Sequence, residues 1–143
     1  MTNRTATTEG TPMEMSDFCT AYALTALFTS MDESDESGGE PMDRNYGIED
    51  LAPETVEAFK KDCARFQKEN EALLFHAYEL TGNSEALAGR DFWLTRNGHG
   101  AGFWDDDWDV DGSSYNGSAI AAVAGDFGEV DLYVGDDGLI YMT

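Results

Sequence analysis

The stretch RDFWLTRNGHGAGFWDDD, residues 90–107, decides the fold class. Phe92, Leu94 and, after a turn, Phe103 alternate with polar or outward-facing positions, and a period of two is typical of a strand. The NGHG run at 97–100 supplies residues that tolerate the positive φ angles of a tight turn. Residues 90–107 are therefore predicted to form a β-hairpin.

Two helices are expected before this hairpin. Ser16 offers an N-cap to an apolar-rich segment, which predicts a helix over 16–30. Pro53 suits the first position of a second helix, in which apolar residues recur at alternating spacings of three and four from Val56 to Leu80. Asn70 interrupts that stripe. The pattern therefore fits either one long helix, whose seam could pair two copies of the chain, or two helices with a break.

A short helix and a second hairpin are expected after it, because residues 118–123 are Ala-rich and residues 129–134 and 139–141 flank an Asp-Asp-Gly turn signal. The predicted class is α+β. Two N-terminal helices precede a β-hairpin, a short helix and a second β-hairpin, and the four strands form one antiparallel sheet packed on the helices. Residues 1–15 are expected to be a flexible tail, and 16–143 a single domain.

Charge restricts the partners. The 143 residues include 29 Asp or Glu and only 8 Lys or Arg, for a formal net charge of −21 at pH 7. Each phosphate contact needs a Lys or Arg to displace a counterion, so direct binding to nucleic acid or to an anionic membrane is not expected. No signal-peptide pattern and no run of about 18 apolar residues occurs. The chain is predicted to be cytoplasmic, in a host cell, and to bind a basic protein.

The acidic residues are concentrated in two segments between predicted elements. Exposed carboxylates there would meet a basic surface through long-range attraction. Solubility or adaptation to high salt would give the same composition, and both interpretations stay open. The predicted partner-binding residues are Asp32, Glu33, Asp35, Glu36 and Glu40 in the first segment and Asp105, Asp106, Asp107, Asp109 and Asp111 in the second.

The sequence DFWLTRNGHGAGFWD over 91–105, the helix-loop-helix segment 26–55 and the closing GEVDLYVGDDG over 128–138 together resemble a large family of small uncharacterised proteins predicted in tailed-phage and plasmid genomes. The resemblance covers most of 16–140. The stretch 106–111 departs from the family pattern, which usually continues with a Gly-containing, helix-forming segment. The resemblance implies an accessory protein of a mobile element and implies no chemistry.

The 91–105 segment is also a candidate ligand site. A histidine between two glycines could act as a general base, and a neighbouring Arg could bind an anion. Turn chemistry and cross-strand aromatic packing explain the same residues, so a structural role stays open. The predicted alternative pocket consists of Trp93, Arg96, Asn97, His99 and Trp104.

No metal and no cofactor is expected. Asp107, Asp109 and Asp111 begin a calcium-loop pattern, but Ser118 stands where a bidentate Glu is needed, so an EF-hand is excluded and only a weak Ca²⁺ site stays open. The residues that could bind zinc share no short ligand spacing. They are Cys19, Cys63, His76 and His99. Both cysteines are expected to be buried, reduced thiols.

These features predict a non-enzymatic, acidic accessory protein of a phage or mobile element that binds a basic host protein. Its most concrete form is a DNA-mimicking inhibitor of a host defence or nucleic-acid-binding system. The alternative is a small ligand- or nucleotide-binding or hydrolytic domain that uses the Arg96-Asn97-Gly98-His99 turn and the neighbouring Trp rings. The chain is expected to be a monomer or a homodimer.

Overall fold

A computed structural model describes residues 15–32, 39–99, 101–110 and 112–143, in which helices dominate. The α-helices in these ranges are α2 (Asp17–Thr29), α3 (Pro53–Glu69), α4 (Glu71–Thr81), α5 (Glu85–Arg96) and α6 (Tyr115–Asp126). Strand β1 (Met31–Asp32) pairs antiparallel with β2 (Glu40–Pro41), and β3 (Leu132–Val134) pairs antiparallel with β4 (Ile140–Met142). Three 3₁₀ turns complete the described elements: η1 (Met42–Arg44), η2 (Ile48–Asp50) and η3 (Asp106–Trp108).

The predicted α+β class, with a four-stranded antiparallel sheet, is wrong. Within the described ranges the strands form two separate two-stranded hairpins, and five helices make up most of the fold. The error arises in the segment 90–107, which is not a β-hairpin: its first part is the second half of α5.

Helix α5 forms because Ser84 caps its first turn and its buried residues recur on one face. The Ser84 hydroxyl accepts a hydrogen bond from the Leu87 N–H at 3.1 Å and caps the first turn. Ala88, Phe92 and Thr95 are buried at helical spacing. These buried residues are spaced by four and then three positions. The alternation that predicted a strand involves only the second half of this helix.

The glycine-rich run after α5 ends the helix instead of turning a hairpin. The Gly98 N–H donates to the Thr95 carbonyl at 3.2 Å, and the His99 N–H donates to the Leu94 carbonyl at 3.0 Å. Gly98 has φ 71°. This pair of bonds closing over a left-handed glycine is the Schellman ending of a helix, which needs the same residue types as a hairpin turn.

The other predicted elements are confirmed. The Ser16 hydroxyl accepts from the Cys19 N–H at 3.1 Å at the start of α2, and Pro53 is the first residue of α3. Asn70 marks the break between α3 and α4. Of the two alternatives for the apolar stripe, one long helix or two helices with a break, the structure has the second. The short helix is present as the longer α6, and the closing hairpin as β3–β4. The predicted tail lies outside the described residues except for Met15.

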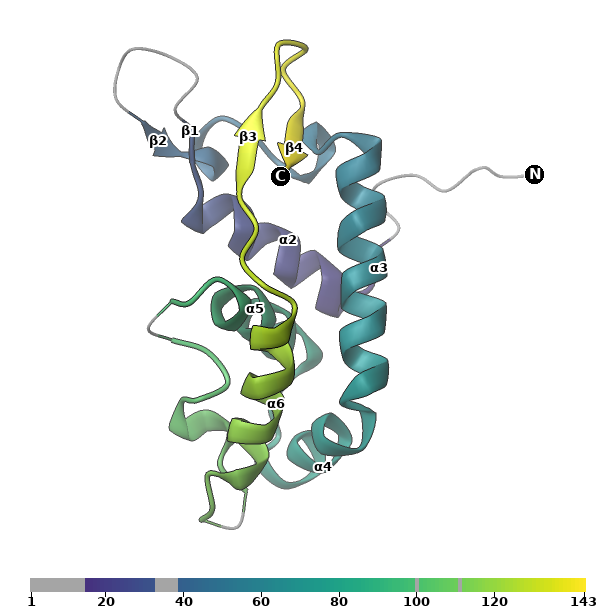
Figure 1. The fold of residues 1–143 in the computed structure, drawn as a ribbon, viewed down its shortest axis with the longest axis vertical. Coiled ribbons are helices and arrows are strands. Elements are labelled where there is room, and N and C mark those ends of the chain that lie inside the picture. Colours follow the sequence, from purple (N-terminus) through teal and green to yellow (C-terminus); the bar gives the residue numbers. More distant parts are fainter. Residues whose placement is uncertain (1–14, 33–38, 100, 111) are drawn as a thin grey trace, which may run out of the picture.

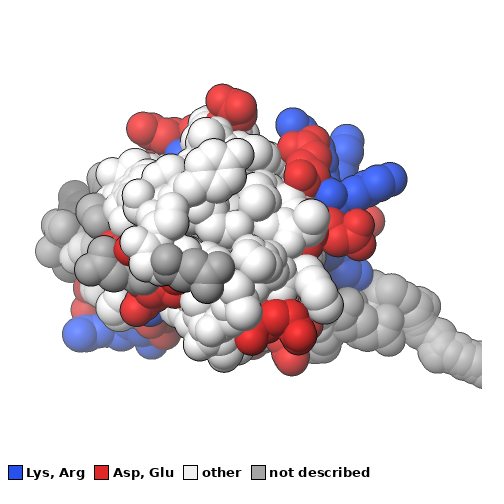
Figure 2. All heavy atoms as spheres, turned by 90° about the horizontal axis from the view of Figure 1, so that it is seen from below, with Lys and Arg blue, Asp and Glu red and all other residues white. Residues whose placement is uncertain are grey.

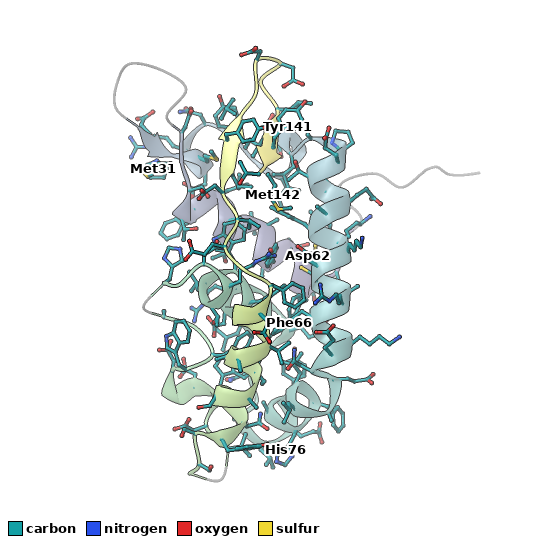
Figure 3. All side chains as sticks on the ribbon, in the orientation of Figure 1. Met31, Asp62, Phe66, His76, Tyr141 and Met142 are labelled. Atoms are coloured by element: carbon teal, nitrogen blue, oxygen red, sulfur yellow. The ribbon has the colours of Figure 1, made fainter. Side chains whose placement is uncertain are left out.

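The core is an aromatic cluster between α2, α3 and α5. Phe66 of α3, at the centre of the molecule in Figure 3, stacks on Phe92 of α5 with ring centroids 4.0 Å apart. Gly89 lets α5 approach α2 closely, because a Cβ at this position would overlap the Phe18 carbonyl oxygen. The position and tilt of α5 are therefore fixed by this contact and by ring packing.

Figure 1 shows how these elements are arranged along the molecule. The hairpins β1–β2 and β3–β4 lie toward one end of the long axis, α4 lies at the other end, and α3 runs along one side. The turn η3 packs against α4 and α6. In the described ranges no helix combines the length and apolarity that crossing a membrane requires.

Candidate functional site

A groove of about 630 Å³ lies beside β3, and we call it the β3 groove. This volume falls within the ~300–1,000 Å³ typical of ligand sites. Met31, which lines it, lies on the side of β3 opposite to β4 (Figure 3). Its walls are Thr29, Ser30 and Met31 from the end of α2 and β1, Trp93, Asn97 and His99 from the end of α5, and residues 129–134.

Three of the five predicted pocket residues meet in this groove. The Trp93 indole is buried, and its Nε1 donates to the Thr29 hydroxyl at 2.8 Å. The Asn97 side chain donates to the Trp93 carbonyl at 3.0 Å and accepts from the Val130 N–H at 2.9 Å. His99 is half-buried. Trp93, Asn97 and His99 therefore form one wall of the groove.

Arg96, predicted to bind an anion, is a core residue with a side chain 4% exposed. Its guanidinium donates to the Asp62 carboxylate at 2.9 Å and to the Tyr22 hydroxyl at 3.0 Å. It also donates to the carbonyls of Gly128 at 2.8 Å and Phe127 at 3.0 Å. Four partners use most of its five N–H donors, so the geometry gives no support to an anion-binding role.

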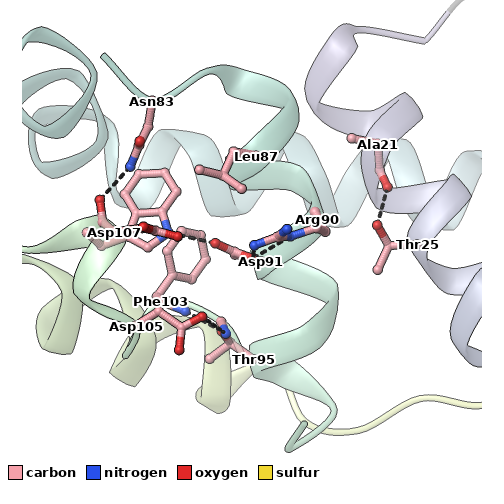
Figure 4. Close-up of polar contacts among 12 residues, drawn as sticks. Ala21, Thr25, Asn83, Leu87, Arg90, Asp91, Thr95, Phe103, Asp105 and Asp107 are labelled. Carbon is pink, nitrogen blue, oxygen red and sulfur yellow. Dashed lines mark hydrogen bonds and ion pairs between the residues drawn. The ribbon is translucent and has the colours of Figure 1, made fainter. Parts of the chain in front are cut away.

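Other residues of the 91–105 segment also make hydrogen bonds within the fold, around α5 (Figure 4). The buried Asp91 carboxylate accepts from the Trp108 indole N–H at 2.6 Å and from Arg90 at 2.8 Å. Burial raises the pKa of Asp91 above its ordinary value, and these two donors oppose the rise. The Thr95 hydroxyl accepts from the Phe103 N–H at 3.0 Å. Trp104, 46% exposed, does not line the groove.

The described residues of the two acidic segments lie toward opposite ends of the molecule (Figure 1). Figure 1 places β1–β2 toward one end of the molecule, whereas η3 packs against α4 at the other. Asp32 is buried, at 9% exposure, and Glu40 pairs with Arg44 at 3.4 Å. Asp107 is exposed, while Asp105 and Asp109 are half-buried. Glu33, Asp35, Glu36, Asp111 and the side chain of Asp106 lie outside what the structure describes.

The end of the molecule that carries α4 is not uniformly acidic. Figure 2, a view from that end, shows a largely uncharged centre with Asp and Glu around its margin and most of the Lys and Arg on one side. Phe75 of α4 is 63% exposed. Opposite charges placed near each other reduce the field that a basic partner would feel over the described part of this end.

The acidic residues that the sequence prediction missed lie on the β3 side. Glu129 and Asp131 are exposed and line the groove, and no Lys or Arg is among the described residues of its walls. The signal was the alternation in EVDLYV, residues 129–134, where acids stand two positions apart. Alternate residues of an extended chain point to the same face, so both carboxylates reach one side.

Metal ligands do not gather within the described ranges, where no group of three or more His, Cys, Asp or Glu is placed to hold an ion. Asp111, which the weak Ca²⁺ site needs, lies outside these ranges. Cys19 and Cys63 are free, and their predicted burial is confirmed. Burial raises the pKa of the Cys63 thiol, which keeps it protonated.

No family model matches the chain, and no curated protein and no solved structure shows significant similarity to it. The proposal for its function therefore comes from the groove and the charge distribution.

Proposed function

We propose that this chain is a non-enzymatic binding protein that captures a basic protein partner, with the β3 groove as its principal contact. Glu129 and Asp131 attract the partner's cations, and the groove wall that includes His99 contacts the parts between them. Complementary charge increases the association rate and selects against acidic competitors.

The observation that carries this proposal is the burial of Arg96. Arg96 is the only Lys or Arg after Arg90 in the sequence, and it is buried against Asp62. The segment 97–143, which supplies one wall of the groove, therefore brings carboxylates to the surface and contains no Lys or Arg to neutralise them. Such repulsion costs stability unless a partner compensates for it.

An accessory role in a phage or other mobile element is the biological setting that the sequence resemblance suggests. In that setting the partner is a basic host protein, and inhibition by mimicry of DNA is expected where that protein's surface ordinarily binds phosphates. Duplex DNA would then compete with this chain for the same partner, and the competition would identify this form of the function.

The test uses a fluorescein-labelled oligoarginine peptide and fluorescence anisotropy. Binding should weaken steeply with added salt, because exposed charges are screened over about 10 Å at 0.1 M. The double substitution Glu129→Gln and Asp131→Asn should weaken binding by about tenfold, since each exposed charge pair contributes a fraction of a kcal/mol to a few kcal/mol. Matched control substitutions are Glu57→Gln and Glu79→Gln, which remove two exposed carboxylates that do not line the groove.

The control variant should lose about twofold or less, through the net charge alone. Equal losses in the two double variants would contradict the assignment to the groove. Binding that ignores both salt and these substitutions would contradict the whole proposal.

A further inference from the structure

We infer that the β3 groove takes up an extended segment of the basic partner as a third strand, hydrogen-bonded along the free edge of β3. This inference rests on the proposed function, because it assumes that the occupant is basic. It adds two statements about the occupant: its conformation is extended, and its basic residues are regularly spaced. Addition of a strand to an exposed sheet edge is a general mode of peptide recognition.

The hydrogen-bond ladder of the hairpin shows which backbone groups face the groove. The Thr143 N–H donates to the Asp131 carbonyl at 3.0 Å, and the Gly135 N–H donates to the Leu139 carbonyl at 2.7 Å. Because bonded residues alternate along an antiparallel strand, residues 131, 133 and 135 turn their backbone toward β4. The N–H and C=O groups of Leu132 and Val134 therefore point the opposite way, to the groove.

One bond on this edge is already made. The Val130 N–H, two residues before Leu132, donates to the Asn97 side chain at 2.9 Å. The Asn97 side chain thus occupies the hydrogen-bonding position of a neighbouring strand at the start of this edge. Beyond it, among the described residues, β3 pairs with β4 alone, so the rest of the edge is open. The outer edge of β4, by contrast, is covered: the Ala52 N–H donates to the Ile140 carbonyl at 2.9 Å.

The opposite wall of the groove can also receive a strand. Met31 of β1 faces Pro41 in the register of the β1–β2 hairpin, and the Ser30 carbonyl accepts from the Met42 N–H at 2.9 Å. By the same alternation, the backbone of Met31 points away from β2, on the groove side. A strand in the groove would therefore lie between the edge of β3 and the backbone of Met31, and a two-stranded hairpin gains stability from a third strand.

The side chains of β3 specify the occupant. Glu129, Asp131 and Tyr133 are all exposed and stand two residues apart. An added strand places alternate side chains opposite them, so its basic residues should recur at every second position. A guanidinium there can pair with Asp131 and stack on the Tyr133 ring, which is 48% exposed. The residues between them face the inner wall and should be apolar.

A second copy of this chain is a poorer occupant of the groove. Pairing two β3 edges would bring Glu129 and Asp131 close to carboxylates of the same kind, and like charges across a strand pair destabilise it. Charge complementarity therefore selects a basic segment over self-association.

The experiment compares two labelled peptides of the same composition with the full-length protein. In one, Arg and Val alternate; in its isomer, all Arg residues precede all Val residues. The alternating peptide should bind about tenfold more tightly, because only an extended chain with this spacing satisfies both the edge and the carboxylates.

The matched variants are Val134→Pro and Val134→Ala. Both remove the valine side chain, but only proline removes the N–H that faces the groove, and this N–H takes no part in the β3–β4 ladder. Val134→Pro should weaken binding of the alternating peptide about tenfold relative to Val134→Ala, with both variants folded by circular dichroism.

The outcomes separate the two proposals. If both peptides bind equally and Val134→Pro binds like Val134→Ala, the groove acts by charge alone: the strand-addition inference is overturned and the proposed function stands. If neither peptide binds, both are overturned. If wild-type protein dimerises in sedimentation experiments and Val134→Pro makes it monomeric, the free edge pairs with a second copy and the inference is again wrong.

Discussion

Arg96 and Asp131 belong to neighbouring segments that are joined by the hydrogen bond from Val130 to Asn97. Their charges nevertheless lie in opposite environments, one buried and one exposed. The Arg96 guanidinium is buried and donates to four partners from α2, α3 and the segment after α6. The Asp131 carboxylate is exposed at the edge of a groove without a Lys or Arg among its described walls. A charge that is buried must be paired to be tolerated, whereas a charge left on the surface without a counterion is available to a partner.

The residues that stabilise the fold are thus distinct from those that we propose bind the partner. The distinctive 91–105 segment, which attracts attention as a motif, is mostly occupied with internal contacts such as those of Asp91, Thr95 and Arg96. The less distinctive segment 129–134 carries the free charges. The motif therefore contributes mostly to the fold, and the carboxylates of the proposed site belong to an ordinary strand segment with an open edge.

The largest expected effect is that of Arg96→Ala. It leaves the Asp62 carboxylate and the Tyr22 hydroxyl without their buried donor, and we expect the free energy of unfolding to fall by about 3–5 kcal/mol, measured by urea denaturation. The control is Arg44→Ala, which breaks an ion pair whose arginine side chain is 66% exposed and should cost less than about 1 kcal/mol. Similar losses in the two variants would mean that Arg96 is not a structural charge.

The next effect concerns the packing of the first half of α5 against the backbone of α2. Gly89→Ala should destabilise the protein by about 1–3 kcal/mol, because the new methyl group meets the Phe18 carbonyl oxygen and forces α2 and α5 apart. Gly125→Ala is the matched control within α6, where a Cβ meets no atom within 4 Å. It should stabilise the helix by about 0.5–1 kcal/mol. A neutral Gly89→Ala would show that the two helices can separate without cost.

Local signals predicted those elements whose ends are fixed locally. The Ser16 cap, Pro53 at the start of α3 and the turn before β4 each depend on a few adjacent residues, and all three are confirmed. Helix α5 was missed because its ending uses Asn97 and Gly98, which serve a helix stop and a hairpin turn equally well. The choice between them is made by burial against α2, which adjacent residues do not reveal.

The candidate site was predictable to a similar degree. Trp93, Asn97 and His99 were expected together, because they are close in sequence. Their meeting with residues 129–134 depends on a long-range contact, the bond between Asn97 and Val130. Arg96 was misassigned for the same reason: its partner Asp62 is 34 positions away in the sequence. Composition predicted a basic partner, but only the folded chain indicates which carboxylates lie beside an open strand edge.

A smaller effect on stability is expected for the exposed carboxylates of Glu129 and Asp131. Glu129→Gln combined with Asp131→Asn should leave the free energy of unfolding within about 0.5 kcal/mol of the wild-type value, with any change toward higher stability, since it removes repulsion between surface carboxylates. Thermal denaturation at low and high salt measures this. Salt should raise the melting temperature of the wild type more than that of the variant. A clear loss of stability would show that these carboxylates have partners in the fold.

The smallest effect concerns the tip of the β3–β4 hairpin, where an exposed carboxylate is partly satisfied from within. The Tyr141 hydroxyl donates to Asp137 at 2.6 Å, and this bond, together with one from the Leu139 N–H, holds the pKa of Asp137 below its ordinary value. The same bond raises the pKa of Tyr141 to about 12. Tyr141→Phe should therefore return the Asp137 pKa toward its ordinary value, as measured by NMR of the side-chain carboxyl.

The sign of the pH dependence follows from these two shifts. Because the folded-state pKa of Asp137 is lowered, its stabilisation is present above the unfolded-state pKa and is lost as the pH falls through the folded-state value. The raised pKa of Tyr141 gives stabilisation that is present below 10.0 and is lost as the pH rises through about 12. Tyr141→Phe should flatten both limbs slightly. Tyr133→Phe is the control, because its ring stacks on Tyr141 without bonding Asp137, and it should leave the Asp137 pKa in place. An unchanged Asp137 pKa in Tyr141→Phe would mean that the tip carboxylates are as free as those beside the groove.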